Sequence, residues 1–180
     1  MIRGNQNIRK GAKIKMVNKL NELLGVDVVI KYLITDNLVS AYSWHYTEDK
    51  ALSHLRNIME YHNLHGEVTE SEALNEWLLK ELQNVVEKGK RFKLPPFNYK
   101  NICVYNKLVG VPRGETITYS ELAKMCKMKY TDVLVTLMRN PFQVLIPCHR
   151  LLTKKGTLMG FYPLGKGVKR RLLELEGANI

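Results

Sequence analysis

A basic segment that ends in two prolines, Lys88–Pro96, most constrains how this chain of 180 residues can fold. Proline fixes its own backbone angle and lacks an amide donor, so neither a helix nor a central strand continues easily through Pro95 and Pro96. We therefore expect a linker here, with an N-terminal domain at 1–92 and a C-terminal domain at 93–180. At 45% hydrophobic and 25% charged residues, the composition is that of an ordinary soluble globular protein. No apolar run approaches the roughly 20 residues of a membrane-spanning helix.

The first half of the sequence changes from strand patterns to helix patterns. Val26–Leu33 is rich in β-branched residues, Leu38–Tyr46 partly alternates, and turn-forming residues lie between them at 35–37, which predicts a β-hairpin. Leu52–Asn63 and Glu70–Lys88 are amphipathic and predict two helices. Strands followed by helices indicate a small mixed α/β domain.

Local signals refine this half. Thr69 and Glu72 form a capping-box pattern that predicts the start of the second helix, and Gly89 predicts its end. The four histidines here lack carboxylate or cysteine partners at ligand spacing, so we expect no metal site at His45, His54, His62 or His65.

After the linker the sequence is mostly helical. A helix is predicted over Tyr99–Val109, where the following glycine stops it. Thr118 and Glu121 form a second capping box, and a further helix over Thr131–Arg139 ends before Pro141. Two short helices joined by about four residues predict a helix-turn-helix.

Positive charge is concentrated in the second half. The net charge is +11, and residues 97–180 hold 14 basic and 5 acidic side chains, against 14 and 12 in residues 1–96. Such an excess attracts a polyanion, most commonly nucleic acid, although a solubilising surface and an acidic protein partner remain open. Met1–Leu20 carries six basic residues, no acid and no secretory signal pattern, so we expect a basic arm that touches DNA or is disordered.

The three cysteines, Cys103, Cys126 and Cys148, are odd in number and far apart. We expect neither a disulfide framework nor a Cys-x-x-Cys zinc site, and a reducing, cytoplasmic location fits. A free thiolate would persist there.

Cys148 has the most reactive setting. An apolar run, predicted as a strand, leads into Pro147, and His149 follows the cysteine. A cysteine is a nucleophile as its thiolate, and neighbouring cationic or imidazole groups lower its pKa, so the rate should rise with the thiolate fraction. The alternative is a buried, inert cysteine beside a structural histidine.

Five blocks in order carry a wider resemblance: Val111–Thr116, Thr118–Ala123, Asn140-Pro141, Pro147–Arg150, and Lys169 with Leu172–Gly177. Over residues 97–180 the chain resembles the O6-alkylguanine-DNA alkyltransferases, also called methylated-DNA–protein-cysteine methyltransferases. Residues 1–96 match only in position and in their strand-then-helix order. The resemblance implies an α/β fold, with a ribonuclease-H-like N-terminal domain and a winged helix-turn-helix in the C-terminal domain.

The resemblance also implies a single-use DNA repair reaction. Cys148 would take the alkyl group from the O6 atom of guanine in one step and keep it as a thioether. His149 would take the thiol proton through a bound water, Glu176 would orient the histidine, and Asn140 would tie the recognition helix to the site. No metal or cofactor is expected.

The implied partner is double-stranded DNA containing O6-alkylguanine, bound by a monomer with the damaged nucleotide flipped out of the stack. Tyr119 would help to rotate the nucleotide and donate to the guanine ring. The backbone carbonyl of Leu151 would read the exocyclic amine, and either Phe161 or Tyr162 would stack on the base. Further DNA contacts are expected at Ser120, Lys100, Arg139 and Lys154.

The second helix of the predicted helix-turn-helix corresponds to the family's recognition helix, and it departs from the family pattern. No alignment puts an arginine at the position whose side chain fills the gap left by the flipped base. One alignment puts Asp132 there, and Lys129 or Tyr130 could substitute. Two other functions stay open: a DNA-binding lesion sensor without transfer, which the presence of Cys148 disfavours, and a cysteine hydrolase, which lacks an oxyanion glycine pattern.

Overall fold

Two antiparallel strands, β1 (Val29–Thr35) and β2 (Leu38–His45), form the predicted hairpin. The computed structural model of the protein describes residues 19–180. Asp36 and Asn37 both have positive φ, as a two-residue hairpin turn requires. A third strand, β3 (Glu67–Thr69), pairs with the other side of β1 and gives the order β2-β1-β3.

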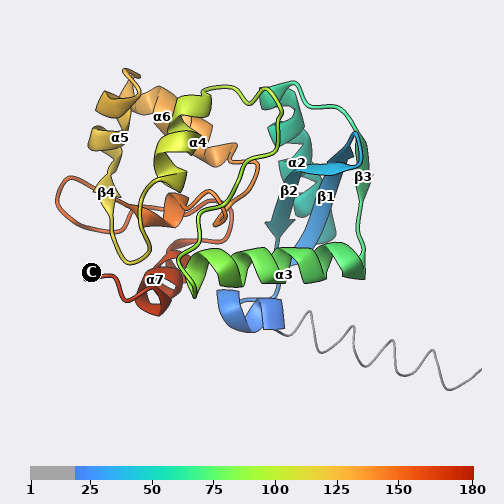
Figure 1. The fold of residues 1–180 in the computed structure, drawn as a ribbon, viewed down its shortest axis with the longest axis horizontal. Helices are drawn as coiled ribbons and strands as arrows, with labels where there is room; N and C mark the ends of the chain where they lie inside the picture. Colours follow the sequence, from blue (N-terminus) through green and yellow to red (C-terminus); the bar gives the residue numbers. More distant parts are fainter. Residues whose placement is uncertain (1–18) are drawn as a thin grey trace, which may run out of the picture.

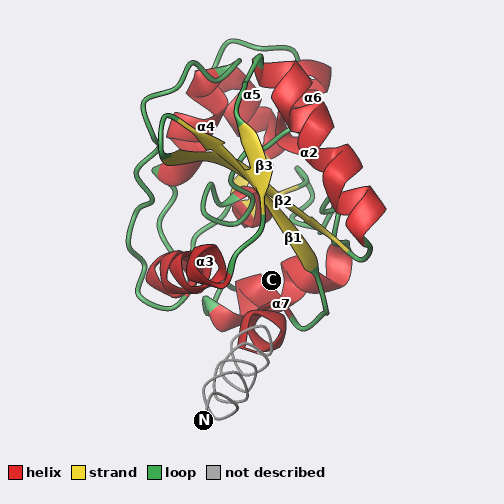
Figure 2. Ribbon diagram, turned by 90° about the vertical axis from the view of Figure 1, so that its right-hand side faces the viewer, coloured by secondary structure: helices red, strands yellow, loops and turns green. Residues whose placement is uncertain are grey.

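The two predicted helices of this half lie on opposite sides of the sheet (Figure 2). α2 (Glu48–His62) packs on β1 and β2, and α3 (Glu72–Val86) meets the other face, where the Tyr32 hydroxyl donates to Asn75 at 2.8 Å. The predicted capping box at Thr69 is wrong. Thr69 ends β3, and the Ser71 side chain caps α3 by accepting from the amide of Leu74.

Residues 88–96 contain no helix or strand, as a linker should. They pass between the sheet and a group of helices at the other end of the molecule (Figure 1). One continuous cluster of buried apolar side chains contains residues from both halves. The division into domains at residue 92 therefore stays a prediction.

The second half begins with α4 (Ile102–Val109), which starts three residues later than predicted because Asn101 adopts a left-handed conformation at φ 55°. α5 (Tyr119–Met125) follows β4 (Ile117–Thr118), and α6 (Tyr130–Met138) begins after a four-residue connection. The capping box at the start of α5 is confirmed, with both of its hydrogen bonds present.

The predicted strand before the reactive cysteine is wrong. Val144 has φ of 76°, and only an isolated bridge joins Gln143 to Ile146, because the chain turns back on itself here. A short 3-10 helix, η1 (Cys148–Arg150), follows, and then β5 (Leu151–Leu152) pairs parallel with β4.

The C-terminal helix α7 (Lys166–Leu175) packs against η1. Within residues 19–180, no helix is long and apolar enough to cross a membrane. In the same range, no group of three or more His, Cys, Asp or Glu residues is arranged to hold a metal ion. Most of the basic arm expected at Met1–Leu20 lies outside the described residues.

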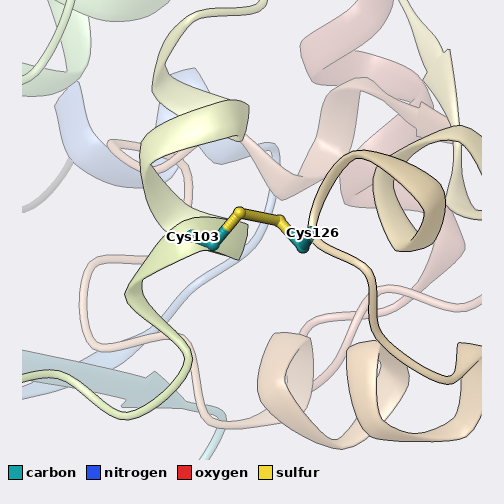
Figure 3. Close-up of a disulfide and its surroundings, with 2 residues drawn as sticks. All are labelled: Cys103 and Cys126. Atoms are coloured by element: carbon teal, nitrogen blue, oxygen red, sulfur yellow. A yellow bond between two sulfur atoms is a disulfide. The ribbon is translucent and has the colours of Figure 1, made fainter.

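Cys103 and Cys126 form a disulfide, contrary to the expectation of free cysteines (Figure 3). Cys103 lies on α4 and Cys126 directly follows α5, and packing of these helices brings the two Cα atoms to 5.7 Å despite 23 residues of separation. Sequence spacing does not report such a distance. Cys148 remains a thiol, but the cysteine pattern no longer supports a reducing compartment.

Candidate active site around Cys148

Cys148 lies in the wall of a pocket of about 430 Å³. Its side chain is buried, with 7% of the residue exposed, and it is the first residue of η1, immediately after the turn that ends at Pro147. The remaining lining comes from Tyr119, from one face of α6, and from the segment between β5 and α7. A largely apolar pocket of this size fits a small-molecule-sized group, such as a single base, next to the sulfur.

Asn140 holds the cysteine turn in place. Its side-chain amide donates to the carbonyl of Ile146 at 3.0 Å and to the sulfur of Cys148 at 3.4 Å, while its oxygen accepts from the amide of Phe142 at 2.9 Å. Because Asn140 follows α6, it joins the end of that helix directly to the sulfur. The family resemblance implies such a connection, and the role of Asn140 in the reaction stays a prediction.

His149 and Glu176 meet in the protein interior, although 27 residues separate them. Nε2 of His149 lies 2.9 Å from a carboxylate oxygen of Glu176, and both side chains are fully buried. Arg150 binds the same carboxylate through Nε and Nη2, with a shortest distance of 2.6 Å. The arginine therefore balances the charge of a carboxylate that could not otherwise stay ionised in the interior.

The buried pair has the protonation states that a general base needs. Burial alone would raise the pKa of Glu176, but the hydrogen bonds from His149 and Arg150 outweigh it and lower the pKa to about 2. Burial lowers the pKa of His149 despite Glu176, so the imidazole is neutral near pH 7. Nδ1 of His149 is buried without a hydrogen-bond partner among residues 19–180, which leaves this nitrogen to accept a proton.

The thiol itself is protonated at neutral pH. Burial raises the pKa of Cys148, and the opposing effects of the Asn140 amide and the charge of Lys169 only partly offset it. The sequence hypothesis expects neighbouring groups to lower this pKa, and the structure gives the opposite net direction. A base must therefore remove the thiol proton when the sulfur reacts.

Tyr119 begins α5 and lines the pocket. The ammonium of Lys169 on α7 donates to its hydroxyl oxygen at 2.8 Å, and neither side chain is appreciably exposed. Burial lowers the pKa of Lys169 to about 8 and raises the pKa of Tyr119. The hydroxyl oxygen already accepts from Lys169, so the hydroxyl hydrogen remains available to a group in the pocket.

The segment after β5 supplies both predicted stacking residues. Phe161 is buried in the pocket wall, while Tyr162 lies at the pocket with 42% of its surface exposed. Leu151 is buried in β5, where it pairs with Ile117 of β4.

The remaining predicted contacts lie around α5 and α6 or away from the pocket. Tyr130 is exposed at the start of α6, with its ring centroid 6.3 Å from that of Tyr119. Lys100 does not join the pocket, since its ammonium lies 4.6 Å above the ring of Tyr61 on α2. The others are at the surface or partly buried: Ser120 in the first turn of α5, Lys129 before α6, Arg139 after it, and Lys154 in the turn after β5.

Three residues make contacts at the site that the sequence does not predict. Arg150 and Lys169 belong to the quoted motif blocks, yet their partners Glu176 and Tyr119 are far along the chain. Gln143 has no sequence signal, although its buried amide lies between the two halves of the molecule. The one sequence signal for these contacts is the position of Arg150, a charged residue directly after the Cys-His pair.

Known proteins give a consistent set of similarities. Residues 100–178 match the family model described as 6-O-methylguanine DNA methyltransferase, DNA binding domain. A methylated-DNA–protein-cysteine methyltransferase of Thermococcus gammatolerans is 30% identical over an alignment of 155 residues that covers 77% of this chain and 83% of the relative. One of the same name from Metallosphaera sedula is 37% identical over 109 residues, or 57% of this chain and 68% of the relative.

A solved structure has the same fold. The O6-methylguanine-DNA methyltransferase of the hyperthermophilic archaeon Pyrococcus kodakaraensis strain KOD1 superimposes with a TM-score of 0.64, covering 84% of this chain and 92% of the other. The two sequences are 24% identical over this match. The similarity therefore includes the mixed α/β half as well as the helical half that carries the pocket.

Proposed function

The chain belongs to the methylated-DNA–protein-cysteine methyltransferase family, whose members repair DNA by moving an alkyl group onto one of their own cysteines, and we propose that Cys148 is the acceptor. One observation carries this assignment. Cys148 is a free thiol in the wall of a pocket and lies next to a buried histidine–glutamate pair. The other two cysteines are joined to each other.

The transfer is a single displacement. The sulfur of Cys148 attacks the alkyl carbon, a carbon–sulfur bond forms, and the bond from that carbon to O6 of guanine breaks. The thiol proton goes to Nδ1 of His149 through a water molecule, as the family resemblance implies, and Glu176 stabilises the imidazolium. The product is a thioether without a good leaving group, so each chain acts once.

The leaving guanine carries negative charge until it is protonated. Tyr119 is the donor that we assign to the guanine ring, because its hydroxyl hydrogen is free to point into the pocket. The adjacent ammonium of Lys169 lowers the cost of giving up that proton. Phe161 offers an apolar surface for the base, and Tyr162 covers its outer side.

DNA is the partner that the second half of the chain suits. O6-alkylguanine in a duplex cannot reach a buried sulfur, so we propose that a monomer flips the nucleotide into the pocket, at a cost of a few kcal/mol. We assign α5 and α6 to a winged helix-turn-helix, on the support of their four-residue connection and of the positive charge of this half. The sheet with α2 and α3 would correspond to a ribonuclease-H-like domain.

Single-turnover labelling tests the assignment. A duplex carrying O6-[methyl-³H]methylguanine should transfer about one label per chain, and Cys148→Ala should abolish the transfer. The double variant Cys103→Ser/Cys126→Ser is the matched control and should be labelled like the parent, because it removes the other two sulfurs. Equal labelling of Cys148→Ala would overturn the assignment, and catalytic turnover beyond one equivalent would overturn the single-use mechanism.

A further inference from the structure

The segment from Phe161 to Leu164 forms one side of the Cys148 pocket without belonging to a helix or strand. Phe161, Tyr162 and Pro163 all line the pocket. We call residues 161–164 the lid segment. Its distance from the sulfur of Cys148, called its height here, depends on the contacts that hold its backbone in place.

Two carbonyls of the lid segment are held by side chains from elsewhere. The carbonyl of Tyr162 accepts from the side-chain amide of Gln143, and the carbonyl of Leu164 accepts from the hydroxyl of Tyr46. Gln143 lies in the turn before the cysteine, and Tyr46 directly follows β2 in the N-terminal half. The lid segment is therefore attached at two points, to the residue that follows β2 and to the cysteine turn.

The orientation of Gln143 is set from the N-terminal half. The indole N–H of Trp44 can only donate, so it selects the side-chain oxygen of Gln143 and turns the NH₂ group towards Tyr162. The hydroxyl of Tyr42 donates to the backbone carbonyl of Gln143. Gln143 is 5% exposed, so each of these polar groups would be costly to leave without a partner.

The three donors come from neighbouring positions along the chain. Tyr42 and Trp44 are two residues apart on β2, so the alternation of a strand directs both to the same side, and Tyr46 directly follows the strand. We call Tyr42, Trp44 and Tyr46 the aromatic row. The other face of β2 is occupied by α2, where the Ser43 hydroxyl donates to the carbonyl of Ala51.

Side-chain packing from the N-terminal half adds to these hydrogen bonds. The ring of His54 on α2 meets the ring of Tyr162 edge-on, with centroids 5.0 Å apart. His45, the last residue of β2, lies 6.5 Å from the same ring. The side chain of Tyr162 thus contacts the N-terminal half directly, while its backbone is linked to that half through Gln143.

We propose that the aromatic row, acting through Gln143 and directly through Tyr46, fixes the height of the lid segment and thereby limits the size of the alkyl group that Cys148 accepts. Gln143 and Tyr46 are positioning residues, since neither lines the pocket. The inference rests on the proposed alkyl transfer. It gives the N-terminal half a role in substrate selection, although none of its described residues lines the pocket.

The test compares two substrates that differ only in alkyl size. Identical duplexes carry O6-methylguanine or O6-benzylguanine, and the second-order rate constant of transfer is measured for each. Tyr46→Phe removes one hydroxyl from a residue that is 45% exposed, and Gln143→Met removes both side-chain hydrogen bonds of the buried amide. Releasing the lid segment should raise the benzyl-to-methyl ratio of rate constants by about 3- to 10-fold in each variant.

Tyr61→Phe is the matched control. Its hydroxyl also joins the two halves, at 2.8 Å from the hydroxyl of Thr136, but it does not touch the lid segment, so the ratio should stay at the parent value. If Tyr46→Phe and Gln143→Met slow both substrates equally, or leave both unchanged, the lid inference is overturned while the proposed function stands. If Gln143→Met fails to fold, Tyr46→Phe alone decides. A parent protein that accepts no label from either duplex would overturn the proposed function together with the inference.

Discussion

The ammonium of Lys169 donates a 2.8 Å hydrogen bond to the hydroxyl of Tyr119, so that helices α7 and α5 meet through a buried polar contact in the pocket wall. The ammonium also lies 5.1 Å from the centroid of the tyrosine ring. Its charge acts on Cys148 as well, where it opposes the rise in pKa that burial causes. One cation thus favours both the thiolate that attacks and the proton donor that we assign to the leaving base.

We expect Lys169→Met to slow alkyl transfer without preventing it. The variant keeps an unbranched side chain one atom shorter and removes the charge, so the pKa of Cys148 should rise further and Tyr119 should donate less readily. A loss of one positioned charged donor predicts a decrease of about 10² in the rate constant of transfer. Single-turnover labelling measures it.

Lys166→Met provides the comparison, because Lys166 is exposed at the start of the same helix. It should change the rate constant of transfer by less than about threefold, through weaker phosphate attraction alone. Equal rates for the two variants would mean that the buried ammonium has no part in the chemistry.

Local signals account for what the sequence predicts correctly. Two such features are the turn at residues 36 and 37 and the capping box of Thr118 and Glu121. Each depends only on residues that are close in the sequence, so tertiary packing does not decide whether it forms. The Thr69 cap fails because Ser71 offers a competing side chain after β3 has formed. The apolar run before Pro147 is buried but is not a strand. Buried positions favour apolar residues whether or not their backbone pairs with another strand.

The candidate site is predictable as a set of residues but not as an arrangement. Motif spacing points to Cys148, His149 and Glu176, yet the Arg150 contact and the Lys169–Tyr119 contact depend on how α7 packs. The contacts of the lid segment are still harder to predict, because Tyr46 and Leu164 are 118 residues apart in the sequence. Hydrogen bonds across such separations follow from the fold and leave no periodic pattern in the sequence.

The rate of transfer should be nearly independent of pH around neutrality, fall in acid, and fall again above about pH 8, where Lys169 loses the charge that favours transfer. Burial lowers the pKa of His149 and raises the pKa of Cys148, so the reactive pair of neutral imidazole and thiol persists between the two values. Protonation of His149 removes the base only below its usual pKa of about 6.5. A pH series of single-turnover rates on unmodified protein checks this. A steady tenfold rise per pH unit from pH 6 to 8 would instead favour direct attack by a free thiolate, as the sequence hypothesis holds.

Glu176 should stabilise the protein more at neutral pH than in acid. Its pKa is about 2 in the folded protein and 4.5 as the reference for an unfolded chain. A lowered folded-state pKa contributes stability that is complete above the unfolded pKa and is lost as pH falls through the folded pKa. The contribution is about 3 kcal/mol at pH 7 and should disappear between about pH 4.5 and 2.

Urea unfolding of Glu176→Gln measures that contribution. The variant leaves Arg150 buried without its carboxylate, so we expect a loss of about 3 to 5 kcal/mol at pH 7 and a difference from the parent that shrinks below pH 4.5. Glu174→Gln, at an exposed position on the same helix, should unfold like the parent at both pH values. A constant difference between the parent and Glu176→Gln from pH 7 to 3 would show that the carboxylate charge is not the source.

The Cys103–Cys126 disulfide should stabilise the helical half without taking part in transfer. Closing a loop with a sequence separation of 23 residues restricts the unfolded chain, which predicts about 3 kcal/mol of stability. Reductant should therefore lower the free energy of unfolding of the parent by that amount and leave Cys103→Ser/Cys126→Ser unaffected. Methyl transfer to Cys148 should continue at the parent rate in both reduced samples at a temperature where they remain folded. A loss of transfer in the folded double variant would instead mean that the link between α4 and α5 holds Tyr119 in its place in the pocket.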